Sequence, residues 1–398
     1  MRGVYGDDSF LNDSYSDDYY IKVSLFASVA LDDISIDKNL TFTASPSGWT
    51  NGNVSVKVST TVTGYTLQTS TDGKTWGTTN PLTFSQNGTA YARLWDGTNA
   101  SSVATLNVTN IDKVVPTNTA PTGSSKDNGI TVTLKQTDAS ATSSYGCSEI
   151  KASETRYAIK KSSSSTWGAW QSSNSFTGLE IGTRYDIKTK VTDYAGNSSE
   201  SNVYTGIIPY TGYYADVNDD GTVDGVIFID LAQGASGKWD GSISSIMGEH
   251  SSPDEAYSYS AVTSGLRSYK TSTKVSSYSG KFGTKQVIVP NGTSGNARLY
   301  VMALSDFDTS THTWSDACSK TQTVGSVTFR LPSKEEWSAF GGQLGITNIS
   351  YLFSGLSRSY WSSTEYDSSS AWYAYFDNGY MYHNNKTNGY SVRLCATF

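Results

Sequence analysis

The stretch DVNDDGTVDG, residues 216–225, carries the side chains best suited to coordinate a hard cation. Asp216, Asn218, Asp220 and Asp224 are spaced as in the first half of a calcium loop of the D-x-[DN]-x-[DN]-G type. An EF-hand needs a bidentate acid at its twelfth position, but here that residue is Ile227, and the residues around it are strand-like. Two interpretations are open: a turn stabilised by Asx side chains, which we favour, and a structural Ca²⁺ site with those four ligands.

The other residues that could carry chemistry do not form a catalytic set. His250, His312 and His383 are scattered, without the H-x-H or H-x-x-x-H spacing of a metal site. No G-x-S-x-G, Walker-type or G-x-G-x-x-G sequence occurs, so hydrolase, NTPase and dinucleotide-binding functions lack support. We therefore predict no catalytic residues.

A more distinctive pattern is AWYAYFDNGYMYHNN, residues 371–385, which alternates like a strand with one buried face. If Asn378 and Gly379 form a two-residue type I′ turn, Phe376 pairs with Met381 in a hairpin. This register predicts that Trp372 and Ala374 share the buried face with that pair.

The opposite face of the predicted hairpin is rich in tyrosine. Tyrosine gives a large, rigid, amphipathic contact at low conformational cost, which is why antibody paratopes favour it. We predict a binding face here; the alternative is a sheet covered by another domain or subunit. Five residues form this face, Tyr373, Tyr375, Asp377, Tyr380 and Tyr382, and neighbouring positions complete the predicted ligand-binding set with Ser357, Ser359, Tyr360, Tyr366, Asp367, Ser369 and, from the inward side, His383.

Composition restricts the class of protein. Charged residues make up 16% and aromatic residues 13% of the 398 residues, with 27 Tyr and 36 Gly, as in β-rich extracellular modules. The formal net charge of −7 and the absence of a basic stripe argue against a nucleic-acid partner. Cys147, Cys318 and Cys395 allow one Cys318–Cys395 disulfide or three free thiols.

Targeting signals are also absent from the sequence. No apolar run is long enough to span a bilayer, and the first residues, MRGVYGDDSF, lack a signal-peptide pattern. We therefore expect no membrane insertion. The chain is interpreted either as a fragment of a larger bacterial surface protein or as part of an exported assembly such as a phage particle.

An internal repeat covers the first half of the chain. IDKNLTFTASPSG (residues 36–48) matches IDKVVPTNTAPTG (residues 111–123), and YTLQTSTDGKTW parallels YAIKKSSSSTW. Short strands separated by turn residues predict tandem β-sandwiches. These segments resemble bacterial immunoglobulin-like or fibronectin-type-III-like modules, in which VTDYAGN is a frequent ending.

The best predicted helix lies in FRLPSKEEWSAFGGQLGI. Ser333 and Glu336 have the spacing of a capping box, and Trp337, Phe340 and Leu344 form a buried stripe. The motif R-L-P-[ST]-x-x-E-W at residues 330–337 resembles C-type-lectin-fold domains of the formylglycine-generating-enzyme type. The later YWSSTE, AW, NG and VRL segments resemble the variable proteins of diversity-generating retroelements.

That resemblance implies a mechanism of variation. In this family a reverse transcriptase randomises the adenines of a template repeat and overwrites the end of the target gene. An AAY codon becomes NNY, whose products include Tyr, Ser, Asp, His, Asn and Phe but never Lys, Glu, Gln, Trp or Met. Residues 351–398 hold eight of the 27 Tyr but one Lys, one Glu and no Gln. All five residues of the predicted binding face can be encoded by NNY, whereas Trp372 and Met381 cannot.

The predicted architecture is multidomain. Residues 1–38 are the remnant of a preceding β module, 39–113 and 114–210 are immunoglobulin-like or fibronectin-III-like sandwiches, and 211–398 are a mixed α/β C-type-lectin-fold domain with a variable region at about 351–398. The resemblance implies binding of an unknown protein or glycan on a cell surface, outside the cell, without a cofactor. Two alternatives are a non-diversified adhesin and, least favoured, a formylglycine-generating-type oxidase, which uses a pair of cysteines where this chain has only Cys395.

Overall fold

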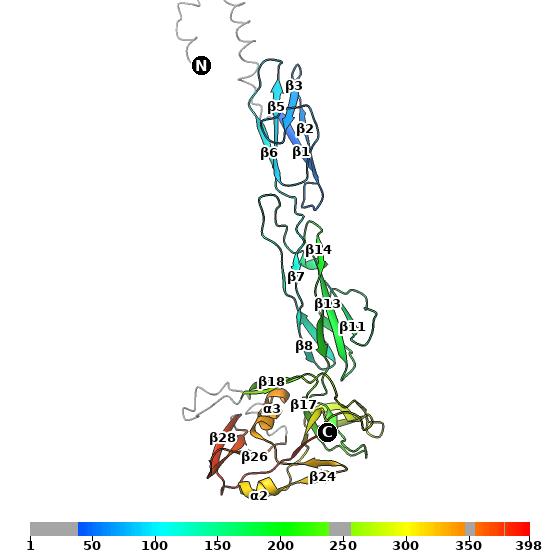
Figure 1. Cartoon of the computed structure of the whole chain (residues 1–398), viewed down its shortest axis with the longest axis vertical. Coiled ribbons are helices and arrows are strands. Elements are labelled where there is room, and N and C mark those ends of the chain that lie inside the picture. The colour runs from blue at the N-terminus through cyan, green and yellow to red at the C-terminus, as the bar shows by residue number, and fades with distance from the viewer. Residues whose placement is uncertain (1–38, 239–255, 347–354, 378) are drawn as a thin grey trace, which may run out of the picture.

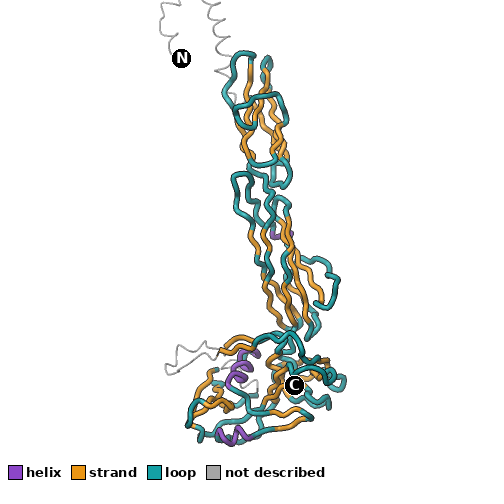
Figure 2. Tube along the Cα trace, viewed as in Figure 1, coloured by secondary structure: helices purple, strands orange, loops and turns teal. Residues whose placement is uncertain are grey.

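The computed structural model describes residues 39–238, 256–346, 355–377 and 379–398. Two β modules follow one another as a column, and the C-terminal part lies at one end of it (Figure 1). Strands dominate all three parts, and the described α-helices lie in the C-terminal part (Figure 2). The predicted remnant at residues 1–38 lies outside the described residues. No described helix combines the length and apolar character needed to cross a membrane.

The first module is a sandwich of two sheets. Strand β5 alternates between buried and half-buried residues, as expected when one face contacts a core. Val54 and Val56 from one sheet meet Ala90 from the other in the buried core. The first sheet is β1 (Leu40–Ser45), β2 (Val54–Thr60) and β4 (Leu82–Phe84); the second is β3 (Thr66–Ser70), β5 (Gly88–Trp95) and β6 (Ala104–Val108).

The second module repeats this design. In its central strand, β13, buried and half-buried residues alternate strictly. Tyr185 and Ile187 of this strand pack against Ile130, Val132 and Phe176 of the facing sheet. One sheet consists of β8 (Thr122–Lys126), β9 (Gly129–Thr133) and β12 (Ser175–Phe176), and β7 (Thr117–Asn118) pairs with β10 (Gln136–Thr137). The other contains β11 (Arg156–Lys161), β13 (Arg184–Thr192), β14 (Ser198–Glu200) and β15 (Tyr204–Ile207).

Hydrogen bonds from the backbone join the two modules. The Asn51 N–H donates to the Ala195 carbonyl at 3.1 Å, and the Gly146 N–H donates to Ile111 at 2.9 Å. Asn197 adds a side-chain hydrogen bond to the Asp112 carbonyl at 3.0 Å. Asn197 belongs to the VTDYAGN sequence, so the turn that closes β13–β14 also holds the preceding module.

A seven-stranded sheet is the centre of the C-terminal part. All six residues of its strand β17 (Gly225–Asp230) are buried, because the sheet has a hydrophobic core on each face. The β16–β22 pair is parallel, and the other pairs are antiparallel. The remaining strands are β16 (Tyr214–Ala215), β20 (Tyr269–Thr271), β21 (Ser277–Gly280), β22 (Gly283–Pro290), β23 (Leu299–Ala303) and β29 (Cys395–Thr397).

Helix α3 (Lys334–Leu344) covers one face of this sheet, as predicted from its sequence. Its capping box is present: the Glu336 N–H donates to the Ser333 hydroxyl, and the Glu336 carboxylate accepts from the Ser333 N–H. Trp337 and Phe340 are fully buried in the core. Gly345 ends the helix with a φ of 63°, a conformation that favours glycine.

Smaller elements surround this centre. They comprise α2 (Trp314–Ser319) and the pairs β18 (Ala235–Lys238) with β19 (Ala256–Tyr259) and β24 (Gln322–Val324) with β25 (Val327–Phe329). The 3₁₀ helix η3 (Ala152–Glu154) lies in the second module. Buried His312 precedes α2 and forms hydrogen bonds through both ring nitrogens, to Asp316 at 2.6 Å and to Asp308 at 2.9 Å. The hydrogen bond with Asp308 contributes most to raising the pKa of His312.

Candidate functional site

The predicted binding residues lie on or beside a three-stranded sheet of β26 (Ser359–Glu365), β27 (Ser370–Tyr375) and β28 (Tyr380–Asn385). The hairpin register differs from the prediction: Tyr375 pairs with Tyr380, and Ala374 pairs with Met381. The two-residue turn is therefore wrong, since β27 ends at Tyr375 and β28 begins at Tyr380; Asn378 itself lies outside the described residues. The reason is Phe376, which is fully buried and donates its N–H to the Arg358 carbonyl at 2.9 Å.

The shift of two residues preserves which side chains share a face, because successive side chains alternate. Ala374, Phe376 and Met381 are buried against α3, as predicted. Tyr373 pairs with Tyr382 on the opposite face.

Two predicted surface residues belong instead to the interior. Tyr360 is fully buried, stacks on Trp337 with 4.9 Å between ring centroids, and donates its hydroxyl to Asp306 at 2.7 Å. Tyr380 is only 1% exposed; it pairs with Tyr375, and its ring lies 6.2 Å from that of Tyr382. The prediction that either is available at the surface is wrong.

The open face carries a cluster of tyrosines that contact one another. Tyr373 stacks on Tyr390 with 4.3 Å between centroids, and Tyr382 lies 5.9 Å from Tyr373 and 5.8 Å from Tyr375. All four are half-buried. Burial is the main cause that raises the pKa of Tyr373. We call Tyr373, Tyr375, Tyr382 and Tyr390 the tyrosine cluster.

A charged pair borders the tyrosine cluster. The Arg358 guanidinium donates to the Asp377 carboxylate and, at 2.5 Å, to the Tyr375 hydroxyl. The Tyr375 hydroxyl in turn donates to Asp377 at 2.9 Å. Burial is the largest cause that raises the pKa of Tyr375, followed by its hydrogen bond to Asp377. Arg358 and Tyr390 were missing from the prediction, although Arg358 lies between the predicted residues Ser357 and Ser359.

Other predicted residues lie elsewhere. Tyr366 and His383 stack on each other with 3.7 Å between centroids, and both contact Trp372 on the sheet face opposite the tyrosine cluster. Asp367 and Ser369 lie in the β26–β27 turn, where Asp367 accepts the Ser369 N–H at 2.7 Å. These hydrogen bonds lower the pKa of Asp367.

The remaining residues of the predicted binding set are Ser357 and Ser359. Ser359 is half-buried and pairs with Tyr375, so it borders the tyrosine cluster. Ser357 instead donates its hydroxyl to Asp306 at 2.6 Å, within the network that also holds Tyr360. The structure thus brings Ser359, Tyr373, Tyr375, Asp377 and Tyr382 together, with buried Tyr380 in contact with Tyr382, and leaves the other predicted residues apart from them.

In the predicted calcium loop, the carboxylates of Asp216 and Asp224 accept hydrogen bonds from backbone N–H groups of the same loop. Both carboxylate oxygens of fully buried Asp216 accept backbone N–H groups, from Asp220 at 3.0 Å and from Gly221 at 2.9 Å. Asp224 accepts from Val217 at 2.8 Å, and burial raises the pKa of Asp224 to about 6. These contacts are those of an Asx-stabilised turn, the favoured interpretation.

A different acidic group, not predicted, lies at the junction of the two sandwich modules. Oxygens of Asp112, Asp138 and Asp193 lie within 4.8 Å of one another. Burial raises the pKa of Asp138, and the charges of the other two add to the effect. Asp112 accepts N–H groups from Val114 and Ser148.

The three cysteines are free thiols, so the Cys318–Cys395 disulfide is not formed. Cys395 is fully buried beside the Arg330–Glu336 ion pair and donates to Glu336 at 3.4 Å. Burial raises the pKa of Cys395 well above its ordinary value. A nucleophilic cysteine needs the opposite shift.

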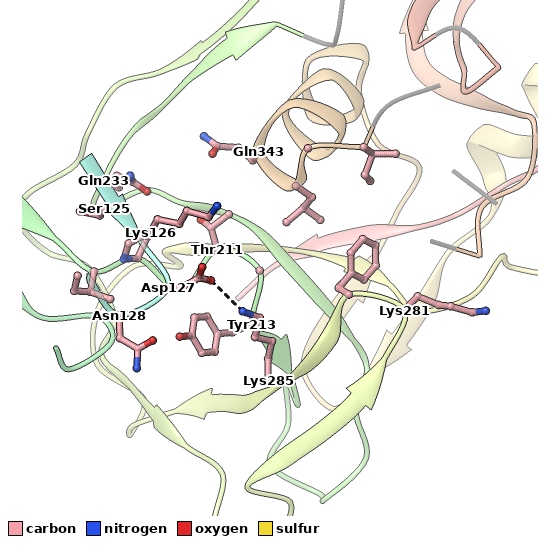
Figure 3. Close-up of a pocket in the computed structure, with 17 residues that line it drawn as sticks. Ser125, Lys126, Asp127, Asn128, Thr211, Tyr213, Gln233, Lys281, Lys285 and Gln343 are labelled. Carbon is pink, nitrogen blue, oxygen red and sulfur yellow. Dashed lines mark hydrogen bonds and ion pairs between the residues drawn. The ribbon is translucent and has the colours of Figure 1, made fainter. Parts of the chain in front are cut away.

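A cavity lies apart from the tyrosine cluster, between the second module and the C-terminal part (Figure 3). Its volume is about 540 Å³. Lys126, Asp127 and Asn128 line it from the second module, and Tyr213 and Lys285 line it from the C-terminal part.

Comparisons with known proteins concern the β modules. No family profile and no curated protein matches the chain. Titin domains A168–A170 share 11% identity, covering 43% of this chain and 66% of that chain with a TM-score of 0.30. A two-domain fibronectin type-III segment of chicken tenascin shares 14% identity over 42% of this chain and 97% of that chain, with a TM-score of 0.19. The human OSCAR ligand-binding domain shares 8%, with the same two coverages and a TM-score of 0.21. These all-β neighbours agree with the two sandwich modules, and at such scores we draw nothing more from them.

Proposed function

We propose that this chain is a ligand-binding surface protein, with the two sandwich modules as a stalk and the C-terminal part as a C-type-lectin-fold domain of the formylglycine-generating-enzyme type. A retroelement diversifies its binding residues. The ligand is a protein or glycan on a cell surface, bound outside the cell.

The tyrosine cluster is the observation that carries this proposal. Tyr373, Tyr375 and Tyr382 are adjacent and half-buried. They extend from a sheet whose opposite face packs against α3 in the hydrophobic core. Rigid aromatic side chains on such a support lose little conformational entropy on binding. Arg358 and Asp377 add charged groups at the border of the surface.

Sequencing of the DNA that flanks the gene tests the diversification. We expect a near-copy of the segment that encodes residues 351–398, beside a reverse transcriptase gene, with differences confined to adenines of that copy. Burial now sharpens the prediction: differences should fall at codons 366, 367, 373, 375, 377 and 382. Codons 360 and 380 should be constant, because both tyrosines are buried.

One observation favours a second candidate, a non-diversified adhesin. Tyr373 stacks on Tyr390 and lies edge-on to buried Trp361, so the tyrosine cluster is also a packed unit. Absence of a near-copy, or differences spread over all bases, would leave this candidate as the better proposal. The formylglycine-generating-type oxidase has the least support, given the buried, protonated thiol of Cys395.

A further inference from the structure

Arg358 is an exposed cation at the border of the tyrosine cluster. Its side chain is 66% exposed, yet its guanidinium is held in a defined position. Nε donates to the Asp377 carboxylate, and Nη2 donates to the Tyr375 hydroxyl at 2.5 Å. The guanidinium also lies over the Tyr375 ring, with its central carbon 5.2 Å from the ring centroid. These contacts orient a charged group that still faces solvent.

The guanidinium keeps donors for a ligand. It carries five N–H groups, of which Asp377 occupies the one on Nε and Tyr375 occupies one on Nη2. Within the described residues, Nη1 of Arg358 forms no hydrogen bond. The Asp377 side chain is only 28% exposed and accepts from both Arg358 and Tyr375. A ligand therefore meets a more accessible cation than carboxylate at this border.

The tyrosine cluster offers ring edges and hydroxyl groups more than open ring faces. Tyr373 and Tyr390 stack on each other at 24°, and Arg358 lies over one face of Tyr375. A sugar ring that stacks through its C–H groups needs an open aromatic face. Tyrosine edges and hydroxyl groups instead suit the side chains and amide groups of a peptide.

The cluster also has the reach of a short peptide. The ring of Tyr375 lies 5.2 Å from the Arg358 guanidinium, Tyr373 lies 6.2 Å from Tyr375, and Tyr390 lies 4.3 Å from Tyr373. An extended chain advances about 3.3 Å per residue, so about five residues can follow this path. A peptide with one residue at Arg358 can thus contact the rings beyond it.

We propose that the tyrosine cluster binds an acidic peptide segment of a protein, with an Asp or Glu side chain of that segment on Arg358. The ligand carboxylate accepts from Nη1 and Nη2, the paired geometry that a guanidinium offers to a carboxylate. Because Asp377 and Tyr375 already orient Arg358, little conformational entropy is lost on binding. This role of Arg358 rests on the proposed function and selects a protein ligand over a glycan.

The test is selection of phage-displayed random peptides on the full chain, followed by calorimetric titration with the best peptide. We expect this peptide to contain Asp or Glu and to bind with a Kd on the order of 10 μM. Arg358→Ala should weaken binding about tenfold, as should replacing the acidic residue of the peptide by its amide. The two losses should not add, because both remove the same contact. Lys57→Ala, at an exposed lysine of the first module, is the control and should leave the Kd unchanged.

Asp377→Asn separates ligand binding by Arg358 from a structural role of the ion pair. The change keeps the size of the side chain but removes a carboxylate that repels the acidic peptide, so binding should tighten about threefold. Equal weakening by Asp377→Asn and Arg358→Ala would show that the pair only shapes the surface, and would overturn the proposal. Thermal unfolding of each variant checks that it is folded.

Other outcomes separate this proposal from the proposed function. A peptide whose binding depends on Tyr382 but not on Arg358 would refute the acidic ligand and leave the proposed function intact. A peptide whose binding is unchanged by Tyr382→Ser would place the site outside the tyrosine cluster and count against both. Enrichment of no peptide would exclude the peptide class and leave a glycan as the ligand.

Discussion

Tyr360 and Trp337 stack at 27° with 4.9 Å between their ring centroids, in the middle of the C-terminal core. Tyr360 also hydrogen-bonds to Asp306, whose carboxylate accepts from buried Arg393 at 2.8 Å. A tyrosine that sequence pattern assigns to the binding surface is therefore part of the scaffold below it. This distinction can be measured, because core and surface tyrosines differ in what their removal costs.

Tyr360→Ser should destabilise the C-terminal part by about 3–5 kcal/mol, since it removes a buried aromatic ring and leaves a cavity. Tyr373→Ser, the matched surface change, should cost roughly 1 kcal/mol because Tyr373 is half-buried. Differential scanning calorimetry of the full chain measures both. Equal losses for the two variants would contradict the assignment of Tyr360 to the core and Tyr373 to the surface.

The Arg358–Tyr375–Asp377 contacts predict opposite pKa changes at one hydroxyl. Asp377→Asn should lower the pKa of Tyr375, since the carboxylate charge and its hydrogen bond raise it. Arg358→Ala should raise the pKa of Tyr375, since the guanidinium lowers it. NMR titration of the tyrosine ring carbons checks both directions. Stability should change by less than about 1 kcal/mol in either variant, because Arg358 is exposed.

His312 predicts a pH-dependent contribution to stability. Its pKa is raised in the folded chain, so its contribution is complete below about pH 6.5 and is lost as pH rises through the folded value. Its partners Asp308 and Asp316 have lowered pKa values, so their part is lost as pH falls below about 4. The difference in Tm between the native chain and His312→Gln should be largest between these limits and should shrink towards pH 9. A difference that grows with pH above 7 would refute this.

Asp216 predicts how the candidate calcium loop responds to metal removal. Asp216→Ala leaves two backbone N–H groups without their acceptor and should cost about 1–3 kcal/mol. We expect the same loss in CaCl₂ and in EDTA, measured by thermal unfolding. A loss confined to CaCl₂ would establish a bound cation in place of the Asx-stabilised turn.

The sequence alone predicted the features that depend on contacts between residues close together in the chain. The capping box of Ser333 and Glu336 forms as predicted, because contacts within one turn determine it. Of the predicted buried stripe of α3, Trp337 and Phe340 are fully buried and Leu344 is half-buried. The faces of β27 were also predicted, since their alternation does not depend on register. The hairpin turn was not, because burial of Phe376 outweighs the preference of Asn378-Gly379 for a two-residue turn.

The features that the sequence did not predict depend on contacts between segments that are distant in the chain. Tyr360 and Tyr373 have the same side chain in similar strands, but Tyr360 is part of the core through contacts that include Trp337 and Asp306, both distant in the sequence. Asp112, Asp138 and Asp193 converge because two modules meet, and no spacing in the sequence marks them as neighbours. The cavity likewise needs two parts of the chain to exist.

Under the proposed function, the hydrogen bonds from Asn51 to Ala195 and from Asn197 to Asp112 affect how the C-terminal part meets its ligand. A flexible tether of equal length would let the C-terminal part sample a large volume. Its effective concentration at any one ligand would then be low. A stiff joint between the two modules instead keeps the C-terminal part at a set distance from the first module. Under the proposed function, a ligand at that distance meets the C-terminal part at a high effective concentration, and repeated copies on one surface would engage a facing surface together.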